Sequence, residues 1–167
     1  YREDLHGLTQ LTMLAPDAYG DIQYFNTHYS HFPLPRLVFQ FCYTTGQRIT
    51  HVRIGVCGSG PLRPQTPMYY YPFSNVNAES GALCIGGNVL PRCPSPHGLA
   101  NLPRFLLSLP NNDDWFSTSR NRPGYDMRTL LELLKDKTPD YYERHILVPN
   151  RRCLAQFIAP NERRHTL

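Results

Sequence analysis

The chain has 167 residues, of which 41% are hydrophobic and 18% are charged, and its formal net charge is +4. This length favours a single domain over 1–167, because such a chain buries about two-thirds of its unfolded surface around one core. No apolar stretch approaches the ~20 residues that cross a bilayer, and the opening Tyr1-Arg2-Glu3-Asp4 has no apolar signal core, so we expect a cytoplasmic protein without a membrane partner.

The segment 1–35 leaves its structure open. Its leucines recur at helical spacing, but the glycine and threonines between them have low helix propensity. Helix, strand and disorder are therefore all compatible with this segment. The leucines are Leu5, Leu8, Leu11 and Leu14, and the intervening residues are Gly7, Thr9 and Thr12.

Three strands are predicted next, at 36–43, 49–57 and 67–71. The first two are rich in β-branched or aromatic residues and are joined by the turn Thr44-Thr45-Gly46-Gln47. Short consecutive strands of this kind predict an antiparallel meander. Alternation in the second strand predicts one buried face, with Val52, Ile54 and Val56 on one side and Arg53, Gly55 and Cys57 on the other.

Helices are predicted after these strands, which gives an α+β fold class. One apolar stripe has helical spacing, and Pro103 starts or kinks that helix. A second helix is predicted at 126–136, between Gly124 and Pro139. The first stripe consists of Leu99, Leu102, Leu106 and Leu109, and the second of Met127, Leu130, Leu131 and Leu134.

The carboxy-terminal segment 143–167 holds much of the positive charge. We interpret it as a solvated tail or a docking surface, because its basic residues do not alternate with aromatics as a nucleic-acid surface would require. No nucleic-acid partner is expected. The basic residues are Arg151, Arg152, Arg163, Arg164 and His165.

The five cysteines are odd in number and irregularly spaced, which predicts reduced thiols rather than a disulfide framework. Cys42 and Cys57 lie in apolar runs and are expected to pack as small hydrophobes. A zinc site would recruit Cys84, Cys93 and His97, but a close Cys-x-x-Cys pair and a fourth ligand are missing. We therefore expect no metal and no cofactor.

Cys84 is the predicted nucleophile. It ends the segment Tyr71-Pro72-Phe73-Ser74-Asn75-Val76-Asn77-Ala78-Glu79-Ser80-Gly81-Ala82-Leu83-Cys84, in which an amide side chain precedes Gly-x-x-Cys. A thiolate exchanges acyl groups, and a nearby carboxamide donates a hydrogen bond to the oxyanion that forms when an amine attacks. The pattern indicates thioester chemistry.

Three ordered matches resemble the ubiquitin-conjugating enzymes, and the resemblance spans roughly 36–142. The segment from Tyr71-Pro72 through Asn75-Val76-Asn77 to Gly81-Ala82-Leu83-Cys84 is similar to the family's His-Pro-Asn box and Gly-x-Ile-Cys. Ser95-Pro96 and Leu106-Leu107-Ser108-Leu109 resemble its Ser-Pro turn and following helix. Pro110-Asn111-Asn112-Asp113-Asp114 resembles its Pro-Asn-x-Asp-Asp segment.

The resemblance implies a four-stranded antiparallel meander followed by helices and three functional residues. Cys84 would carry the carboxy-terminal acyl group of a ubiquitin-like protein and pass it to a lysine. Asn75 would orient the active-site loop or donate to the oxyanion. Asp114, beside Asp113, would position the incoming lysine and help remove its proton.

Because of departures from the pattern, the resemblance is to an outlying branch of the family. The box lacks its histidine, two residues separate Pro72 from Asn75, and Gly86 stands where aspartate is common. Bacterial members similar to this, called protein B of the PRTRC system, are encoded beside a ubiquitin-like protein, a ThiF-like activating enzyme and a JAB-type deconjugating protease. These, with target lysines, are the partners that the resemblance implies.

Other interpretations of the same residues stay open. Cys84 could be a buried thiol at a strand end, and Asn75 and Asp114 could be ordinary turn residues. The chain could be a non-catalytic module that keeps the fold and binds a ubiquitin-like tail. It could also be a cysteine hydrolase in which His97 serves Cys84 as base.

Overall fold

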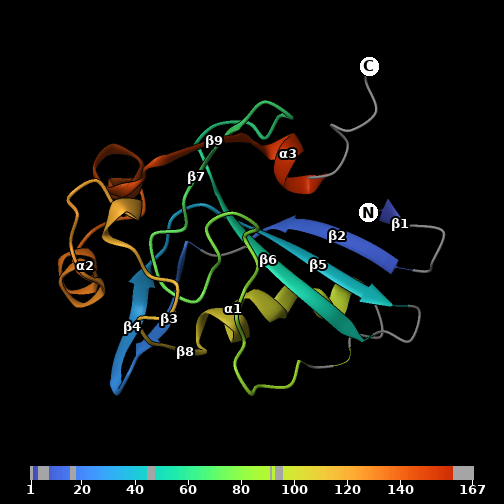
Figure 1. Ribbon diagram of the computed structural model, residues 1–167, viewed down its shortest axis with the longest axis horizontal. Helices are drawn as coiled ribbons and strands as arrows, with labels where there is room; N and C mark the ends of the chain where they lie inside the picture. The colour runs from blue at the N-terminus through green and yellow to red at the C-terminus, as the bar shows by residue number, and fades with distance from the viewer. Residues whose placement is uncertain are drawn as a thin grey trace.

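The computed structural model describes residues 2–3, 8–15, 18–44, 48–90, 92 and 96–159. Its strands form two sheets (Figure 1). The strands are β1 (Arg2–Glu3), β2 (Leu8–Leu14), β3 (Tyr19–Tyr24), β4 (Thr27–Pro33), β5 (Leu37–Thr44), β6 (Ile49–Cys57), β7 (Pro67–Tyr69), β8 (Pro110–Asn111) and β9 (Pro149–Cys153).

The larger sheet has the order β1-β2-β5-β6-β7-β9, and all its neighbours are antiparallel. The smaller sheet has the order β4-β3-β8, in which β3 and β4 form an antiparallel hairpin and β3 and β8 run parallel. The helical segments are a 3-10 helix (Pro96–Asn101), α1 (Leu102–Leu107), a 3-10 helix (Thr118–Arg120), α2 (Met127–Leu134), a π-helical turn (Tyr142–Ile146) and α3 (Leu154–Ile158).

The larger sheet is covered on both faces. On one face, buried side chains of β5 and β6 join those of α1, α2 and the β3–β4 hairpin in the main core. On the other face, Val38 and Met68 pack with Leu154 and Phe157, of which the last two belong to α3. Figure 1 shows α1 and α3 on opposite sides of the strands.

The prediction that the strand at 49–57 has only one buried face is therefore wrong for residues 52–57. Every residue from Val52 to Cys57 is buried, because α3 covers the side that the alternation left to solvent. Gly55 lies on that side, and a Cβ built on it would stand 2.6 Å from Met68 Cε and 2.9 Å from Phe157 Cε2. Glycine at this position lets α3 approach the strand.

The α+β class is confirmed, and the main predicted elements exist. The strands predicted at 36–43 and 49–57 correspond to β5 and β6, and the strand predicted at 67–71 ends at Tyr69. The helix predicted at 126–136 is α2, which begins after Asp126, whose Oδ1 accepts the Thr129 N–H at 2.9 Å. The stripe at 99–109 divides into a 3-10 helix and α1, with Pro103 in the first turn of α1.

Several elements were not predicted. The open segment 1–35 holds β2 and the β3–β4 hairpin, and α3 with β9 turns the carboxy-terminal segment into part of the sheet and its cover. Arg151 and Arg152 thus lie in a strand rather than in a solvated tail. Arg163, Arg164 and His165 lie outside the described residues.

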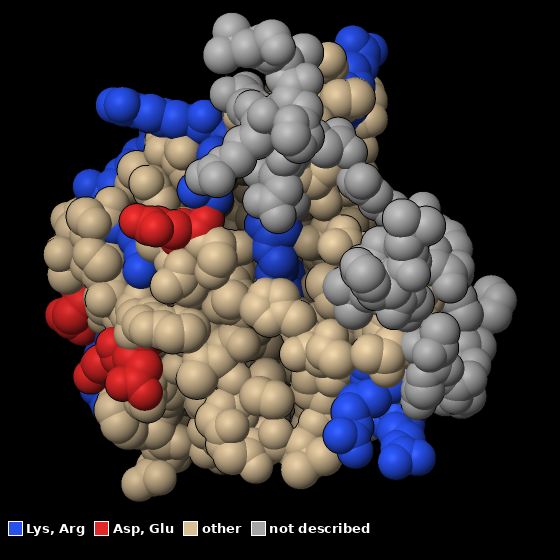
Figure 2. Space-filling view, turned by 45° about the vertical axis from the view of Figure 1, so that its right-hand side comes forward, with Lys and Arg blue, Asp and Glu red and all other residues tan. Residues whose placement is uncertain are grey.

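In Figure 2, the Lys and Arg side chains of one face stand in separate groups, with uncharged and acidic side chains among them. Across the described residues, none of the helices combines the length and apolarity that crossing a membrane requires.

We predict that Gly55→Ala destabilises the protein by about 1–3 kcal/mol, because the added methyl overpacks the contact between β6 and α3. Gly87→Ala is the matched control, since a Cβ there meets no atom within 4 Å and Gly87 has no positive φ. Urea unfolding followed by circular dichroism measures both. Equal midpoints for the two variants would contradict the packing described for α3.

Candidate functional site

Cys84 ends a hairpin-like segment, which we call the Cys84 loop (residues 74–84). Its two arms pair at Val76 and Leu83, and the Asn77 N–H donates to the Ala82 carbonyl at 2.9 Å. The returning arm also pairs with β6, because the Leu83 N–H donates to the Val52 carbonyl at 2.9 Å. The loop is therefore docked on the larger sheet just before its cysteine.

Cys84 is half-buried at the point where the returning arm leaves β6. Its backbone N–H donates to the Asn75 carbonyl at 2.8 Å. This bond joins the two ends of the loop and holds the backbone of Cys84 beside that of Asn75. The residues that follow, Gly86 and Gly87, have nothing within 4 Å of an ideal Cβ, so the chain beyond the thiol is open on that side.

Asn75 connects the cysteine to a third segment of the chain. Its own N–H donates to the Asp114 carbonyl at 2.9 Å, and its side-chain Nδ2 donates to the Pro110 carbonyl at 3.0 Å. Its φ of 62° is left-handed, a conformation that asparagine adopts more readily than most residues. Asn75 thus holds the Cys84 loop against the turn that contains Asp114.

Asp114 lies in an exposed turn that orders its own carboxylate. Its N–H donates to Asn112 Oδ1, and its Oδ2 accepts from Asn112 Nδ2, both at 2.7 Å. The neighbouring Asp113 accepts the Tyr24 hydroxyl at 2.7 Å. Burial, together with this hydrogen bond, raises the pKa of Tyr24 to about 12, so the phenol is a neutral donor across the neutral range.

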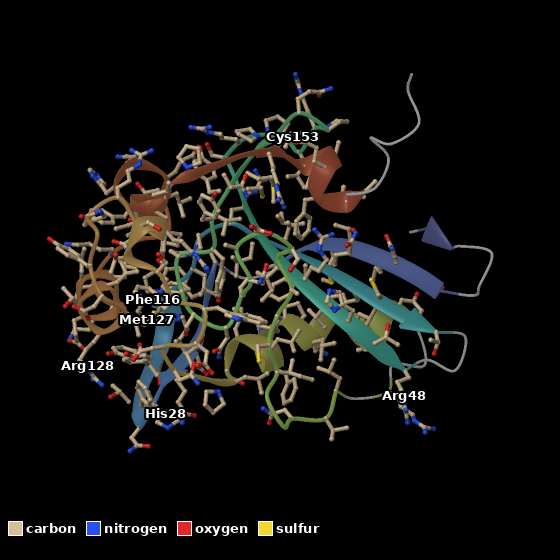
Figure 3. The ribbon with its side chains drawn as sticks, viewed as in Figure 1. His28, Arg48, Phe116, Met127, Arg128 and Cys153 are labelled. Atoms are coloured by element: carbon tan, nitrogen blue, oxygen red, sulfur yellow. The ribbon has the colours of Figure 1, made fainter. Side chains whose placement is uncertain are left out.

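The structure brings together the three predicted site residues, Cys84, Asn75 and Asp114, through a series of backbone hydrogen bonds. Three further residues that support them were not predicted as site residues. Tyr24, at the end of β3, holds Asp113, and Arg128, labelled in Figure 3, lies over the Tyr24 ring at 5.2 Å. Asn111 accepts the Ser74 hydroxyl at 3.2 Å and donates to the Gln23 carbonyl at 3.1 Å.

Only the pairing of β3 with β8 puts Tyr24 beside the turn. Pro110–Asn111 pairs in parallel with Gln23 and Tyr24, which are separated from it by more than eighty residues of chain. The tyrosine sits in a segment whose structure the sequence left open. No local motif could have indicated its contact with Asp113.

Three residues with left-handed backbone meet at this place. Of the described non-glycine residues with positive φ, Asn75, Phe25 (48°) and Trp115 (57°) belong to the site or its border. The Phe25 N–H donates to the Asn111 carbonyl at 2.9 Å, and Trp115 follows Asp114. Both aromatic side chains are 47% exposed. Such backbone is common in turns, and Phe25 lies in the turn between β3 and β4.

Three arginines anchor the far end of the Cys84 loop. Arg53 Nε donates to the Ser80 carbonyl at 2.6 Å, and Arg120 Nη1 donates to the Val76 carbonyl at 2.9 Å. Arg152 Nη1 donates to the Glu79 carbonyl. The loop is therefore held by the sheet, by the Asp114 turn and by three guanidinium groups.

The other cysteines are less suited to react. Burial raises the pKa of both Cys42 and Cys57, which disfavours the thiolate. Cys153 is half-buried where β9 meets α3 (Figure 3), and its backbone N–H donates to Gln156 Oε1 at 2.9 Å at the start of α3. Cys93 lies outside the described residues.

The zinc and hydrolase alternatives both depend on His97. The side chain of His97 lies outside the described part of the chain, as does Cys93. Among the residues that are described, no group of three or more His, Cys, Asp or Glu side chains could hold a metal ion. The described surroundings of Cys84 are thus the Cys84 loop, the turn that contains Asp114, and the residues that hydrogen-bond to them.

A scan of protein-family models, a search of curated proteins and a search of solved structures each found no match to this chain.

We predict that Cys84 in the native protein reacts with iodoacetamide at least a hundredfold faster than Cys42 or Cys57. The reason is access, because the two buried thiols react only when the structure opens. Mass spectrometry of peptides after timed labelling measures all three rates. Labelling in denaturant is the control, where the rates should converge. Native labelling of Cys84 no faster than that of Cys42 would contradict the proposed accessibility.

Proposed function

We propose that this chain is a ubiquitin-conjugating-enzyme-like protein that carries a ubiquitin-like modifier as a thioester on Cys84 and transfers it to a lysine. The observation that supports this proposal is the series of backbone hydrogen bonds from Cys84 to Asn75 and from Asn75 to Asp114. These bonds connect Cys84 and Asn75 with Asp114, which lies 30 positions after Cys84 and 39 after Asn75, so the proposed nucleophile, loop-holding amide and acceptor-positioning carboxylate belong to one hydrogen-bonded group.

A UBC-like fold is part of the proposal. The neighbouring strands β2, β5, β6 and β7 run antiparallel in that order, and α1 and α2 follow Cys84 in the chain. The β3–β4 hairpin is inserted between the first two of these strands. With β9 and α3 at the end of the chain, it would be an addition to the family's core.

The first step would be thioester exchange. The Cys84 thiolate attacks the thioester carbonyl that joins the modifier to the cysteine of a ThiF-like activating enzyme. A new carbon–sulfur bond forms, the old one breaks, and the enzyme's thiolate leaves. One thioester replaces another, so the step is nearly isoenergetic and needs no further energy source.

The second step would be attack by a lysine amine. The incoming ammonium must lose a proton before it can attack, and the exposed Asp114 carboxylate would hold it and help remove that proton. The amine's C–N bond forms as the Cys84 thiolate leaves. One N–H of the Asn75 amide is already used by the Pro110 carbonyl, which favours the loop-orienting role for this residue.

The proposal names the partners by chemistry. They are a ubiquitin-like protein, its activating enzyme, lysines of target proteins, and a JAB-type protease that would cleave the product in the same system. Reduced thiols, as in a cytoplasm, would be required for Cys84 to act. A non-catalytic module that binds the modifier's tail, and a cysteine hydrolase, would give different products in the experiment below.

We predict a thiol-sensitive adduct on a non-reducing gel when the chain is incubated with the ubiquitin-like protein, the activating enzyme and ATP. Cys84→Ala should abolish it. Cys84→Ser should give an oxyester that resists thiols, because an alkoxide leaves less readily than a thiolate. Cys153→Ser is the matched control and should load normally.

The outcomes separate the alternatives. Binding without an adduct, with an activating enzyme shown to be competent, would leave the non-catalytic module. Steady release of free modifier to water without an acceptor would indicate the hydrolase. Loading of Cys84→Ala would exclude Cys84 as the carrier.

We predict that Asp114→Asn slows discharge of the loaded modifier to free lysine at least tenfold and leaves loading unchanged. The amide keeps the size of the side chain but no longer holds the ammonium or takes its proton. Single-turnover discharge at several lysine concentrations measures the effect. Asp136→Asn, at an exposed aspartate after α2, is the control. Equal discharge by both variants would remove Asp114 from the mechanism.

A further inference from the structure

A small cavity lies beneath the tip of the Cys84 loop. Its volume is about 30 Å³, enough for one or two water-sized atoms, and it opens beside the exposed residues Glu79 and Ser80. Three of its lining residues are arginines, Arg53, Arg120 and Arg152. These residues come from β6, the second 3-10 helix and β9, so only the folded chain assembles the group.

Arg53 is the innermost of the three. It is 7% exposed, and its charge is met by neutral groups: the Gln40 Oε1 and the Phe157 carbonyl, each 2.7 Å from Nη1, and the Ser80 carbonyl at Nε. The Phe157 ring lies 4.5 Å from its Cζ. A buried cation held only by neutral groups is costly.

Arg120 and Arg152 add two further positive charges, and no negative charge is paired with them in the described residues. Each donates one N–H to a carbonyl of the loop, and in the described part of the chain neither forms an ion pair with a carboxylate. Glu79 is the one acidic side chain among the cavity's lining residues, so positive charge is in excess. Burial lowers the pKa of Arg53, and the charge of Arg152 lowers it further.

We propose that this cavity is a binding site for a small oxyanion, a phosphate or carboxylate group whose oxygen atoms enter between the three guanidinium groups. Planar guanidinium donors match the oxygens of both groups. The volume admits oxygen atoms and leaves the rest of the ligand at the opening. This site is separate from the Cys84 thiol and does not depend on the proposed conjugating activity.

A bound oxyanion would also act on the loop. Each of the three arginines holds a different carbonyl of the loop, at Val76, Glu79 and Ser80. An anion between them would offset their mutual repulsion and keep all three anchors in place. Occupancy should therefore protect the amides of the Cys84 loop from hydrogen exchange.

The test is the binding of inorganic phosphate, and separately of acetate and chloride, by the whole chain at constant ionic strength maintained with bromide. Thermal midpoint against anion concentration gives an apparent Kd. For the wild type we expect a saturable rise with phosphate, acetate or both. Arg152→Gln and Arg120→Gln should each weaken the apparent Kd about tenfold or more, which is the loss of one charge-assisted hydrogen bond.

The matched control is Arg151→Gln, which removes the same charge from an exposed neighbour that does not line the cavity. It should bind as the wild type does. Two arginine variants are used because, if circular dichroism shows that one of them does not fold, the other still tests the proposal.

A non-saturating rise shared by all the variants would overturn the proposal and leave the arginines as loop anchors only. So would a response to chloride alone. A phosphate response without an acetate response would assign the site to phosphate groups, and the reverse would assign it to carboxylates.

Discussion

Asn75 uses both of its peptide groups to connect segments that are distant in sequence. Its N–H reaches the Asp114 carbonyl, and its carbonyl receives the Cys84 N–H. The left-handed backbone at this residue directs the two groups to different partners. A hydrogen bond of this kind contributes about 0.5–1.5 kcal/mol, so the bonds matter less for overall stability than for where they hold the thiol.

Other contacts hold in place the segments that Asn75 connects. Tyr24 and Asn111 fix the turn from the side of β3, the larger sheet fixes the returning arm of the loop, and arginines fix its tip. The anchoring of Arg53 depends in turn on α3, whose Phe157 supplies both a carbonyl and a ring to the guanidinium. The carboxy-terminal segment thus bears on the Cys84 loop through direct contacts.

Local residue patterns in the sequence predicted the elements that depend on neighbouring residues alone. The β-branched and aromatic runs predicted β5 and β6, and the leucine period predicted α2. Asn75 and Asp114 were singled out by the resemblance to ubiquitin-conjugating enzymes, and the structure connects their backbones to that of Cys84. The alternation of apolar residues in β6 predicted one exposed face, but α3 buries the face that carries Arg53 and Gly55. A short polar strand such as β9, with Arg151 and Arg152 at its centre, has no apolar signal to reveal it.

The β3–β4 hairpin was missed for a related reason. Its register shifts between Gly20 and Ile22, which breaks the alternation that marks a strand. Its turn carries Phe25 in a left-handed conformation where a glycine or asparagine would have given the usual signal. The contact of Tyr24 with Asp113 depends on that hairpin, and so it was not visible in the sequence.

The central claim is that Cys84 is the residue that takes the acyl group. The most direct test is to isolate the loaded chain under non-reducing conditions and locate the modifier by peptide mass spectrometry. Our account predicts that the modifier's carboxy terminus is joined to the Cys84 sulfur. Attachment at Cys93 or Cys153 instead, or an unmodified chain after incubation with an activating enzyme shown to be competent, would contradict it.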